Sequence, residues 1–181
     1  KTLDVDSTAL GFSGGFPGDF ITQTLEDSNI QSDFVQVDED TRINVKLKSG
    51  QETEINAPGP KVTHAQFEQL LSQIRRTTKD DIVIVAGSVP NSISSDAYAQ
   101  IAQITEKTGA QLVVDAEKDL VETVLPYRPL FIKPNKDELE VMFNTTVKSD
   151  EDVIKYGKEI LKKGAQSVII SLGGDGAISV S

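Results

Sequence analysis

Asp81-Ile82-Val83-Ile84-Val85-Ala86 is an apolar run rich in β-branched residues, and it predicts a buried strand. A helical pattern follows from about Ser95 to Lys107, with Tyr98, Ile101, Ala102 and Thr105 on one face. Leu112-Val113-Val114-Asp115 then predicts a second strand. A strand, a helix and another strand in this order indicate a parallel βαβ unit.

The same alternation extends along most of the chain and predicts a doubly wound parallel α/β sheet with helices on both faces. The expected helix at 19–29 has an apolar face of Phe20, Ile21 and Leu25. Further strands are expected at 9–12, 34–37, 130–132 and 168–172, and further helices at 118–125 and 135–143. Two more helices have predicted N-caps, one from Thr63, with Gln66 three residues on, and one from Ser149 to Lys163.

Residues 41–56 break this pattern. Ile43, Val45 and Leu47 alternate with polar residues up to a Ser49-Gly50 turn, which indicates an antiparallel hairpin with one buried face. We therefore expect two parts, an α/β core of residues 1–40 and 57–181, and a small β-hairpin lid of residues 41–56.

Charge and cysteine content exclude several classes of function. The 181 residues include 18 basic and 28 acidic side chains, a net charge of −10, which argues against nucleic-acid or anionic-membrane partners. The absence of cysteine excludes disulfides, thiolate metal sites and thiol nucleophiles, and it fits a cytoplasmic protein. His64, the single histidine, is expected to be a solvated surface residue.

Polar residues follow several predicted strands, at the edge where parallel sheets bind ligands. Ser88 follows Gly87 after one strand and could meet a sugar or phosphate oxygen, although an ordinary turn is the alternative. Lys133 and Asn135 follow another. Asn135 and Glu138 share a helical face and could hold Mg²⁺ through water, or could form a plain helix cap.

Two more segments could bind anions. The Gly173-Gly174-Asp175-Gly176 loop after Ser171 could expose backbone amides to a phosphate, or could be a hairpin turn. Arg42, Asn44 and Lys46 alternate onto one strand face, which suits a sugar phosphate, although charges also guard edge strands. Asp115 is expected to be a structural residue at a strand end.

Five segments in this order resemble the pfkB-type carbohydrate kinases of ribokinase-like fold. They are 41–46, 56–60, 86–90, 133–139 and 171–177. The resemblance implies transfer of a phosphoryl group from MgATP to a sugar phosphate, either fructose 1-phosphate or tagatose 6-phosphate. A binding module without catalysis is the alternative from another class.

The resemblance also implies roles for individual residues. Arg42, Asn44 and Ser88 would contact the sugar phosphate, whereas Lys133 and Asn135 would meet the ATP phosphates. Glu138, with Asn135, would support Mg²⁺. Ser171, Gly173, Gly174, Asp175 and Gly176 would border the nucleotide. The hairpin would close over the sugar, and it could join two copies into a homodimer.

Two further segments are expected outside this chain. The resemblance places a Gly-Gly-Lys-Gly-type sugar-binding segment before residue 1 and a Gly-Ala-Gly-Asp segment after Ser181. The Asp of the second segment would be the catalytic base and its amides the anion hole. We therefore expect no catalytic base within these 181 residues, and no turnover by this chain alone.

Overall fold

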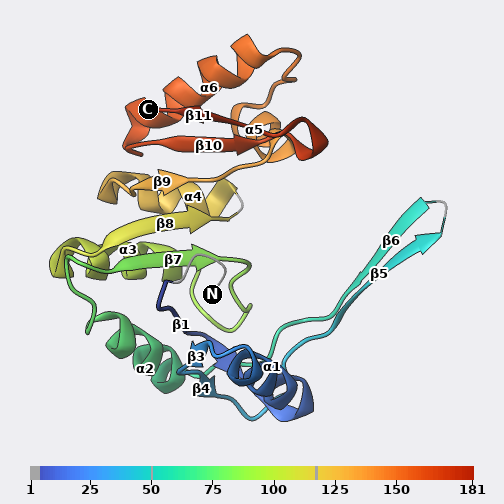
Figure 1. The fold of residues 1–181 in the computed structure, drawn as a ribbon, viewed down its shortest axis with the longest axis vertical. Coiled ribbons are helices and arrows are strands. Elements are labelled where there is room, and N and C mark those ends of the chain that lie inside the picture. The colour runs from blue at the N-terminus through green and yellow to red at the C-terminus, as the bar shows by residue number, and fades with distance from the viewer. Residues whose placement is uncertain (1–4, 50, 117) are drawn as a thin grey trace. The chain divides into compact units, whose positions relative to one another are not determined.

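The computed structural model describes residues 5–49, 51–116 and 118–181 (Figure 1). They form two compact units. The first runs up to Ser72 and includes Pro90–Ser94, and the second combines Gln73–Val89 with Ser95–Ser181. None of the helices in the described ranges is both long and apolar enough to cross a membrane.

The second unit contains a five-stranded sheet in the order β11-β10-β9-β8-β7. Its first four strands along the chain are parallel, and β11 pairs antiparallel with β10. Because β7, β8, β9 and β10 pair in parallel, their arrowheads point to one edge (Figure 1). The strands are β7 (Ile82–Ala86), β8 (Gln111–Asp115), β9 (Phe131–Ile132), β10 (Val168–Ser171) and β11 (Ala177–Val180).

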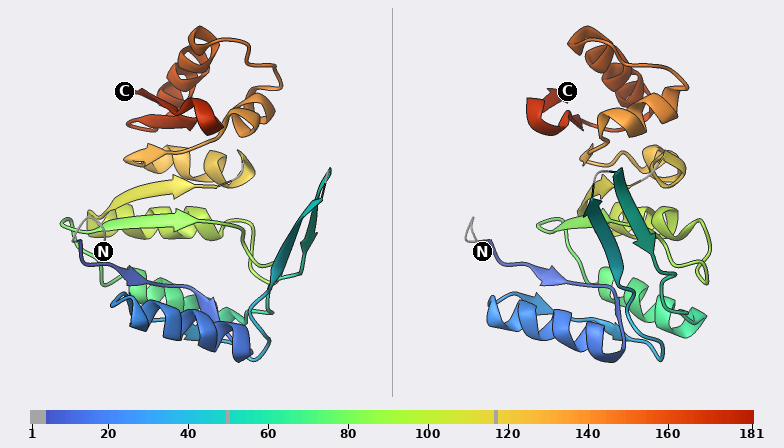
Figure 2. Two further views of the ribbon diagram at one scale, coloured as in Figure 1. Left: turned by 45° about the vertical axis from the view of Figure 1, so that its right-hand side comes forward. Right: turned by 90° about the vertical axis from the view of Figure 1, so that its right-hand side faces the viewer.

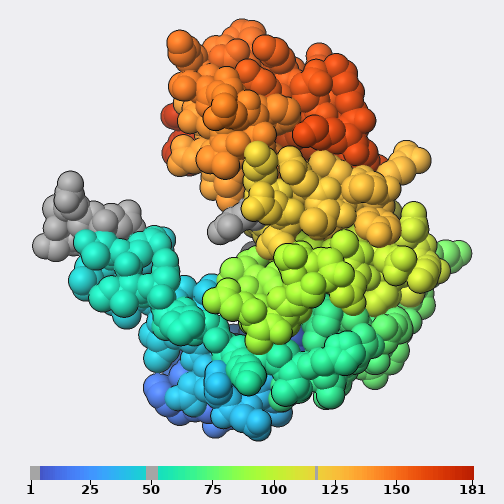
Figure 3. All heavy atoms as spheres, turned by 180° about the vertical axis from the view of Figure 1, so that it is seen from behind, coloured from blue at the N-terminus to red at the C-terminus, as the bar shows by residue number. Residues whose placement is uncertain are grey.

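The helices of the second unit form one layer on one face of this sheet (Figure 2, right). Right-handed crossovers between strands in chain order place every connecting helix on the same face. Seen from behind, α3 and α4 cover the strands (Figure 3). The parallel α/β class is confirmed, and among the described residues of the second unit no helix lies on the other face, where helices were also predicted (Figure 2). The helices are α3 (Ala97–Thr108), α4 (Lys118–Val124), α5 (Lys136–Phe143) and α6 (Asp150–Lys163).

The core of this unit lies between the sheet and that helix layer. Val114, Ile132 and Ile170 from the strands are fully buried, as is Leu139 of α5. The prediction that β7 is wholly buried was wrong, since Ile82 and Ile84 are 57% and 68% exposed. Exposed residues alternate with half-buried ones along β7, so the face that carries Ile82 and Ile84 is not packed against other described residues as the central strands are.

Helix α6 shows how sequence signals set a helix and its packing. Ser149 caps it by accepting a hydrogen bond from the Asp152 amide, and acidic residues fill its first turn and lysines its last, which complements the helix dipole. A Cβ on Gly157 would lie 2.9 Å from Cγ2 of Val180. The missing side chain therefore lets α6 lie close to β11.

The first unit contains short parallel pairs beside one helix. Strand β1 (Thr8–Ala9) pairs with β3 (Gln31–Ser32), and β2 (Phe12–Ser13) pairs with β4 (Val35–Gln36). The strand expected at 9–12 is thus interrupted at Leu10 and Gly11, where Gly11 has φ 153°.

Helix α1 (Gly15–Asp27) begins four residues before its predicted start. The predicted apolar face was wrong for Phe20 and Ile21, which are 72% and 40% exposed. The helix instead buries Pro17 and Gly18. A Cβ on Gly18 would lie only 2.5 Å from Oγ of Ser13, so α1 approaches β2 through its small residues and turns the phenylalanine away.

Helix α2 (His64–Ile74) begins where its cap predicts. The Gln66 amide donates to Oγ1 of Thr63 at 3.3 Å, and the Thr63 amide donates to Oε1 of Gln66 at 2.8 Å. This reciprocal pair is a capping box. His64 follows the cap and is exposed, as expected.

The hairpin is confirmed as the antiparallel pair β5 (Asn44–Ser49) and β6 (Gln51–Asn56). Its predicted turn includes Gly50, which lies outside the described residues. The prediction of one buried face was wrong, because Ile43, Val45, Leu47 and Ile55 are 42% to 58% exposed. Among the strands described, these two pair only with each other, so no second layer covers the apolar side chains.

Tyr98 ties helix α3 to the end of β7. Its ring is buried, and its hydroxyl donates to the Gly87 carbonyl at 2.8 Å. Burial, with a smaller contribution from the negative charge of Asp115, raises the pKa of Tyr98 to about 12. The folded state therefore favours the neutral phenol.

This pKa predicts a stability change at alkaline pH. In the unfolded chain the phenol ionises near pH 10, so its contribution is complete below pH 10 and is lost as the pH rises to about 12. We expect the free-energy difference between wild type and Y98F to shrink by roughly 2 kcal/mol over this window. Urea unfolding at pH 8 and across the window measures it; a constant difference would contradict the prediction.

Candidate active site

The candidate residues of the second unit follow the carboxyl ends of β7, β9 and β10, and these strand ends lie at one edge of the sheet (Figure 1). Register places Ala86 beside Asp115 and Val114 beside Ile132. An isolated parallel bridge between Asn135 and Ser171 extends this edge. Parallel register therefore brings together polar groups from four strands at the edge where open α/β sheets bind ligands.

The turn after β7 is held from two sides. The Gly87 amide donates to the Asp115 carbonyl at 3.3 Å, and the Gly87 carbonyl accepts the Tyr98 hydroxyl. Gly87 has φ 89°, which favours glycine. Ser88 follows this turn and is exposed at the sheet edge. Its predicted role toward a sugar phosphate stays a prediction.

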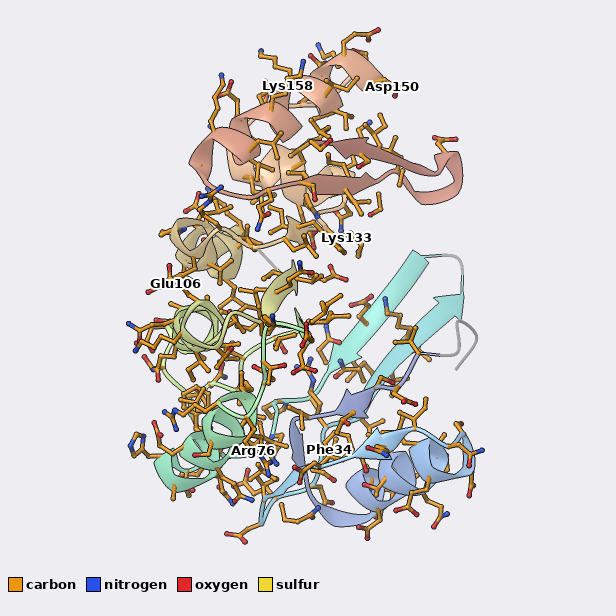
Figure 4. All side chains as sticks on the ribbon, turned by 60° about the vertical axis from the view of Figure 1, so that its left-hand side comes forward. Phe34, Arg76, Glu106, Lys133, Asp150 and Lys158 are labelled. Carbon is orange, nitrogen blue, oxygen red and sulfur yellow. The ribbon has the colours of Figure 1, made fainter. Side chains whose placement is uncertain are left out.

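Lys133 follows β9 and reaches back to the neighbouring strand (Figure 4). Its Nζ lies 3.1 Å from Oδ2 of Asp115. The Lys133 amide also donates to the Val114 carbonyl at 3.0 Å. Sequence reasoning treated Asp115 as a structural residue and missed this ion pair. The sequence feature that could have indicated the pair was the position of Asp115 at the end of a predicted strand.

Asn135 and Glu138 form a complete capping box at the start of α5. The Glu138 amide donates to Oδ1 of Asn135 at 2.8 Å, and the Asn135 amide donates to Oε2 of Glu138 at 2.8 Å. The plain-cap interpretation is therefore confirmed. It does not exclude a ligand, because each accepting oxygen keeps a second lone pair and a carboxylate has a second oxygen.

These two residues fit a hydrated magnesium ion. Mg²⁺ usually takes one or two protein oxygens, with water and substrate phosphates as its other ligands. Asn135 is exposed and Glu138 is half-buried, so both can be reached. No group of three or more acidic, histidine or cysteine side chains suited to a metal occurs in the part of the chain that the structure describes. A site with few protein ligands is consistent with that.

The glycine-rich loop forms a single 3₁₀ turn, η2 (Gly173–Asp175), between β10 and β11. The loop therefore connects two antiparallel strands, so the hairpin-turn interpretation of this segment is confirmed. The amides of Leu172, Asp175 and Gly176 donate to carbonyls within the loop, so those of Gly173 and Gly174 are the candidates for a ligand. Ser171 is tied to the other loop, since its amide donates to the Pro134 carbonyl at 3.0 Å.

Arg42 and Asn44 belong to the first unit, at the base of the hairpin. The Thr41 amide donates to the Gly14 carbonyl at 2.8 Å, and the Gly14 amide donates to Oγ1 of Thr41 at 3.1 Å. This anchor, which the sequence pattern did not reveal, fixes the chain just before Arg42. Strand β5 begins at Asn44, so the predicted strand alternation does not extend to Arg42.

The polar face of the hairpin is organised by one ion pair. Lys46 and Glu54 are cross-strand partners, and Nζ lies 2.5 Å from Oε1. Hydrogen bonds from Lys46 and Asn56, together with the lysine charge, lower the pKa of Glu54. Asn44 lies opposite Asn56 in the same register. The predicted cationic row is therefore partly neutralised at Lys46.

Known proteins with similar sequences indicate the family of this chain. The chain is 42% identical over 178 residues to a 1-phosphofructokinase of Bacillus subtilis strain 168, which covers 98% of this chain and 59% of that protein. It is 37% identical to a D-tagatose-1-phosphate kinase of Bacillus licheniformis, again over 98% of this chain and 59% of that protein.

A solved structure is similar to this chain in fold as well as in sequence. The crystal structure of a candidate phosphofructokinase from Staphylococcus aureus is 77% identical, with a TM-score of 0.85, and the match covers 99% of this chain and 59% of that one. The chain thus spans about three fifths of the length of these relatives. The family described as pfkB family carbohydrate kinase matches residues 1–181, and the chain belongs to that family.

Proposed function

We propose that this chain is the central part of an ATP-dependent 1-phosphofructokinase. The enzyme would transfer the γ-phosphoryl group of MgATP to the 6-hydroxyl of fructose 1-phosphate and give fructose 1,6-bisphosphate. Attack would be direct and in line, with no covalent enzyme intermediate. The 42% identity to the 1-phosphofructokinase of B. subtilis is the observation that carries this proposal.

The carboxyl edge of the sheet supports the nucleotide part of the proposal. Lys133 would contact the ATP phosphates, and the loop at Gly173–Gly176 would border the nucleotide. Asn135 and Glu138 would hold Mg²⁺ through water, and the ion would neutralise charge on the phosphates. Arg42, Asn44 and Ser88 would contact the sugar phosphate.

A kinase for a tagatose phosphate is the second candidate, because the chain is 37% identical to a D-tagatose-1-phosphate kinase. The deciding experiment compares kcat/KM of the full-length gene product on fructose 1-phosphate, tagatose 1-phosphate and tagatose 6-phosphate. The proposal requires the highest kcat/KM on fructose 1-phosphate. ATP binding without turnover of any sugar phosphate would favour a binding module instead.

Arg42 provides a specific test of the sugar-phosphate site. An arginine can clamp a phosphate through two hydrogen bonds, so we expect R42A in the full-length gene product to raise the KM for sugar phosphate about 10- to 100-fold. R42K should have an intermediate KM, because lysine keeps the positive charge but lacks the two parallel N–H donors of the guanidinium group. R76A removes the same charge from an exposed residue of the second unit (Figure 4) and is the control. An unchanged KM in R42A would remove this role.

Glu138 can be tested separately from its cap. In E138Q the amide oxygen can still accept the Asn135 amide, so the cap is kept while the charge is lost. We expect the Mg²⁺ concentration for half-maximal rate to rise about tenfold, with little change in unfolding free energy. D137N, which removes an exposed carboxylate from the same helical turn, is the matched control. A magnesium profile that is equal in both variants would rule out the metal role of Glu138.

We also propose that the hairpin 41–56 acts as a lid and joins two copies into a homodimer in the cytoplasm. A two-stranded hairpin is marginally stable alone in water, and here its apolar face is exposed while the other face carries the Lys46–Glu54 pair. A second hairpin would cover the apolar face and leave the polar face for the sugar phosphate. The absence of cysteine fits the cytoplasm.

The dimer can be tested by charge insertion. Val45 and Ile55 are cross-strand partners on the apolar face, so we expect the V45E/I55E variant of the full-length gene product to sediment as a monomer where the wild type is a dimer. V141E places the same charge on an exposed apolar residue of α5 and should stay dimeric. A hairpin variant that remains a dimer would contradict this interface.

A further inference from the structure

The proposed function assigns no role to the ion pair between Asp115 and Lys133. Asp115 ends β8 and Lys133 directly follows the neighbouring parallel strand β9, and Nζ lies 3.1 Å from Oδ2. Lys133 is the cation that the nucleotide site needs, whereas a carboxylate beside it opposes the binding of a phosphate. The pair therefore needs an explanation at this edge.

A contribution to the folding stability does not explain the ion pair between Asp115 and Lys133. The side chains of Lys133 and Asp115 are 41% and 40% exposed, and ion pairs this open to water contribute between about 0 and 1 kcal/mol. A free lysine side chain instead carries about 2 kcal/mol of rotamer entropy. The main physical effect of the pair is to restrict where the ammonium group lies before a ligand arrives.

The carboxylate is itself on a rigid support. Strand β8 lies inside the sheet between β7 and β9. The Asp115 carbonyl accepts the Gly87 amide at 3.3 Å, and the preceding Val114 carbonyl accepts the Lys133 amide at 3.0 Å. The end of β8 is thus held from both sides. A charge fixed in this way can orient a flexible partner, which a carboxylate on a mobile loop could not do.

We propose that Asp115 is a positioning residue that holds the Lys133 ammonium at the carboxyl edge, ready for the nucleotide phosphates. This inference rests on the proposed function, because it assigns Lys133 to ATP. Asp115 acts through Lys133 and does not itself touch the nucleotide. Removing the carboxylate should therefore matter only while Lys133 is present.

A double-mutant cycle in the full-length gene product tests this dependence. We expect D115N to lower kcat/KM for ATP about fivefold, the upper limit for a pair this exposed, with D115E recovering part of the loss because it keeps the charge. In a K133M background, D115N should change kcat/KM less than about twofold, because the partner is already absent. E159Q, which breaks the exposed Lys162–Glu159 pair on α6, is the control and should leave kcat/KM unchanged.

A second readout needs no catalysis. The ¹⁵Nζ signal of Lys133, assigned by its absence in K133R, should be observable in wild type and E159Q and be lost or shifted in D115N. Two results would overturn the inference. One is a fall in kcat/KM on D115N substitution that is of similar size with and without Lys133, and the other is a ¹⁵Nζ signal of Lys133 that is the same in D115N as in the wild type. If the wild type lacks kinase activity, the proposed function fails, and calorimetric ATP affinity replaces kcat/KM in the same cycle.

Discussion

Parallel pairing of strands that are consecutive in the chain is the constraint on which this structure depends. It brings the carboxyl ends of β7, β8, β9 and β10 to one edge, and right-handed crossovers then place the helices on one face. Residues more than 80 positions apart, such as Ser88 and Ser171, thereby reach the same edge of one sheet. The apolar cores of the strands supply the stability, and the polar residues after them supply the chemistry.

The sequence predicted elements well where two independent signals agreed. The capping residues Thr63 and Ser149 each introduce the helix expected of them, because a local hydrogen bond and an amphipathic pattern indicate the same start. Burial was predicted less well. Phe20 and Ile84 are apolar and correctly assigned to a helix and a strand, yet both are exposed. Periodicity shows which side chains share a face, but only tertiary packing decides whether that face is covered.

In the candidate site, too, features with a local sequence pattern were predictable, whereas contacts between residues distant in sequence were not. Asn135 and Glu138 could be found from sequence because their spacing of three is itself a local signal, and the structure confirms the helix cap that was one of its two interpretations. The Asp115–Lys133 pair joins residues 18 positions apart across two strands, and the Thr41–Gly14 anchor spans 27. Neither has a local pattern, so each becomes visible only once the register of the strands is known.

The capping box shows why structural and functional interpretations of one motif need not compete. The cap uses one oxygen of Glu138 and fixes the direction of the carboxylate, and a fixed carboxylate is a better partner for a hydrated cation than a freely rotating one. The ion pair of Lys133 follows the same logic, because a contact of little value for stability restricts a flexible charge. At this edge, local structure orders the groups that the proposed phosphoryl transfer requires. A substitution that keeps the structural contact while removing the charge can therefore separate the two roles.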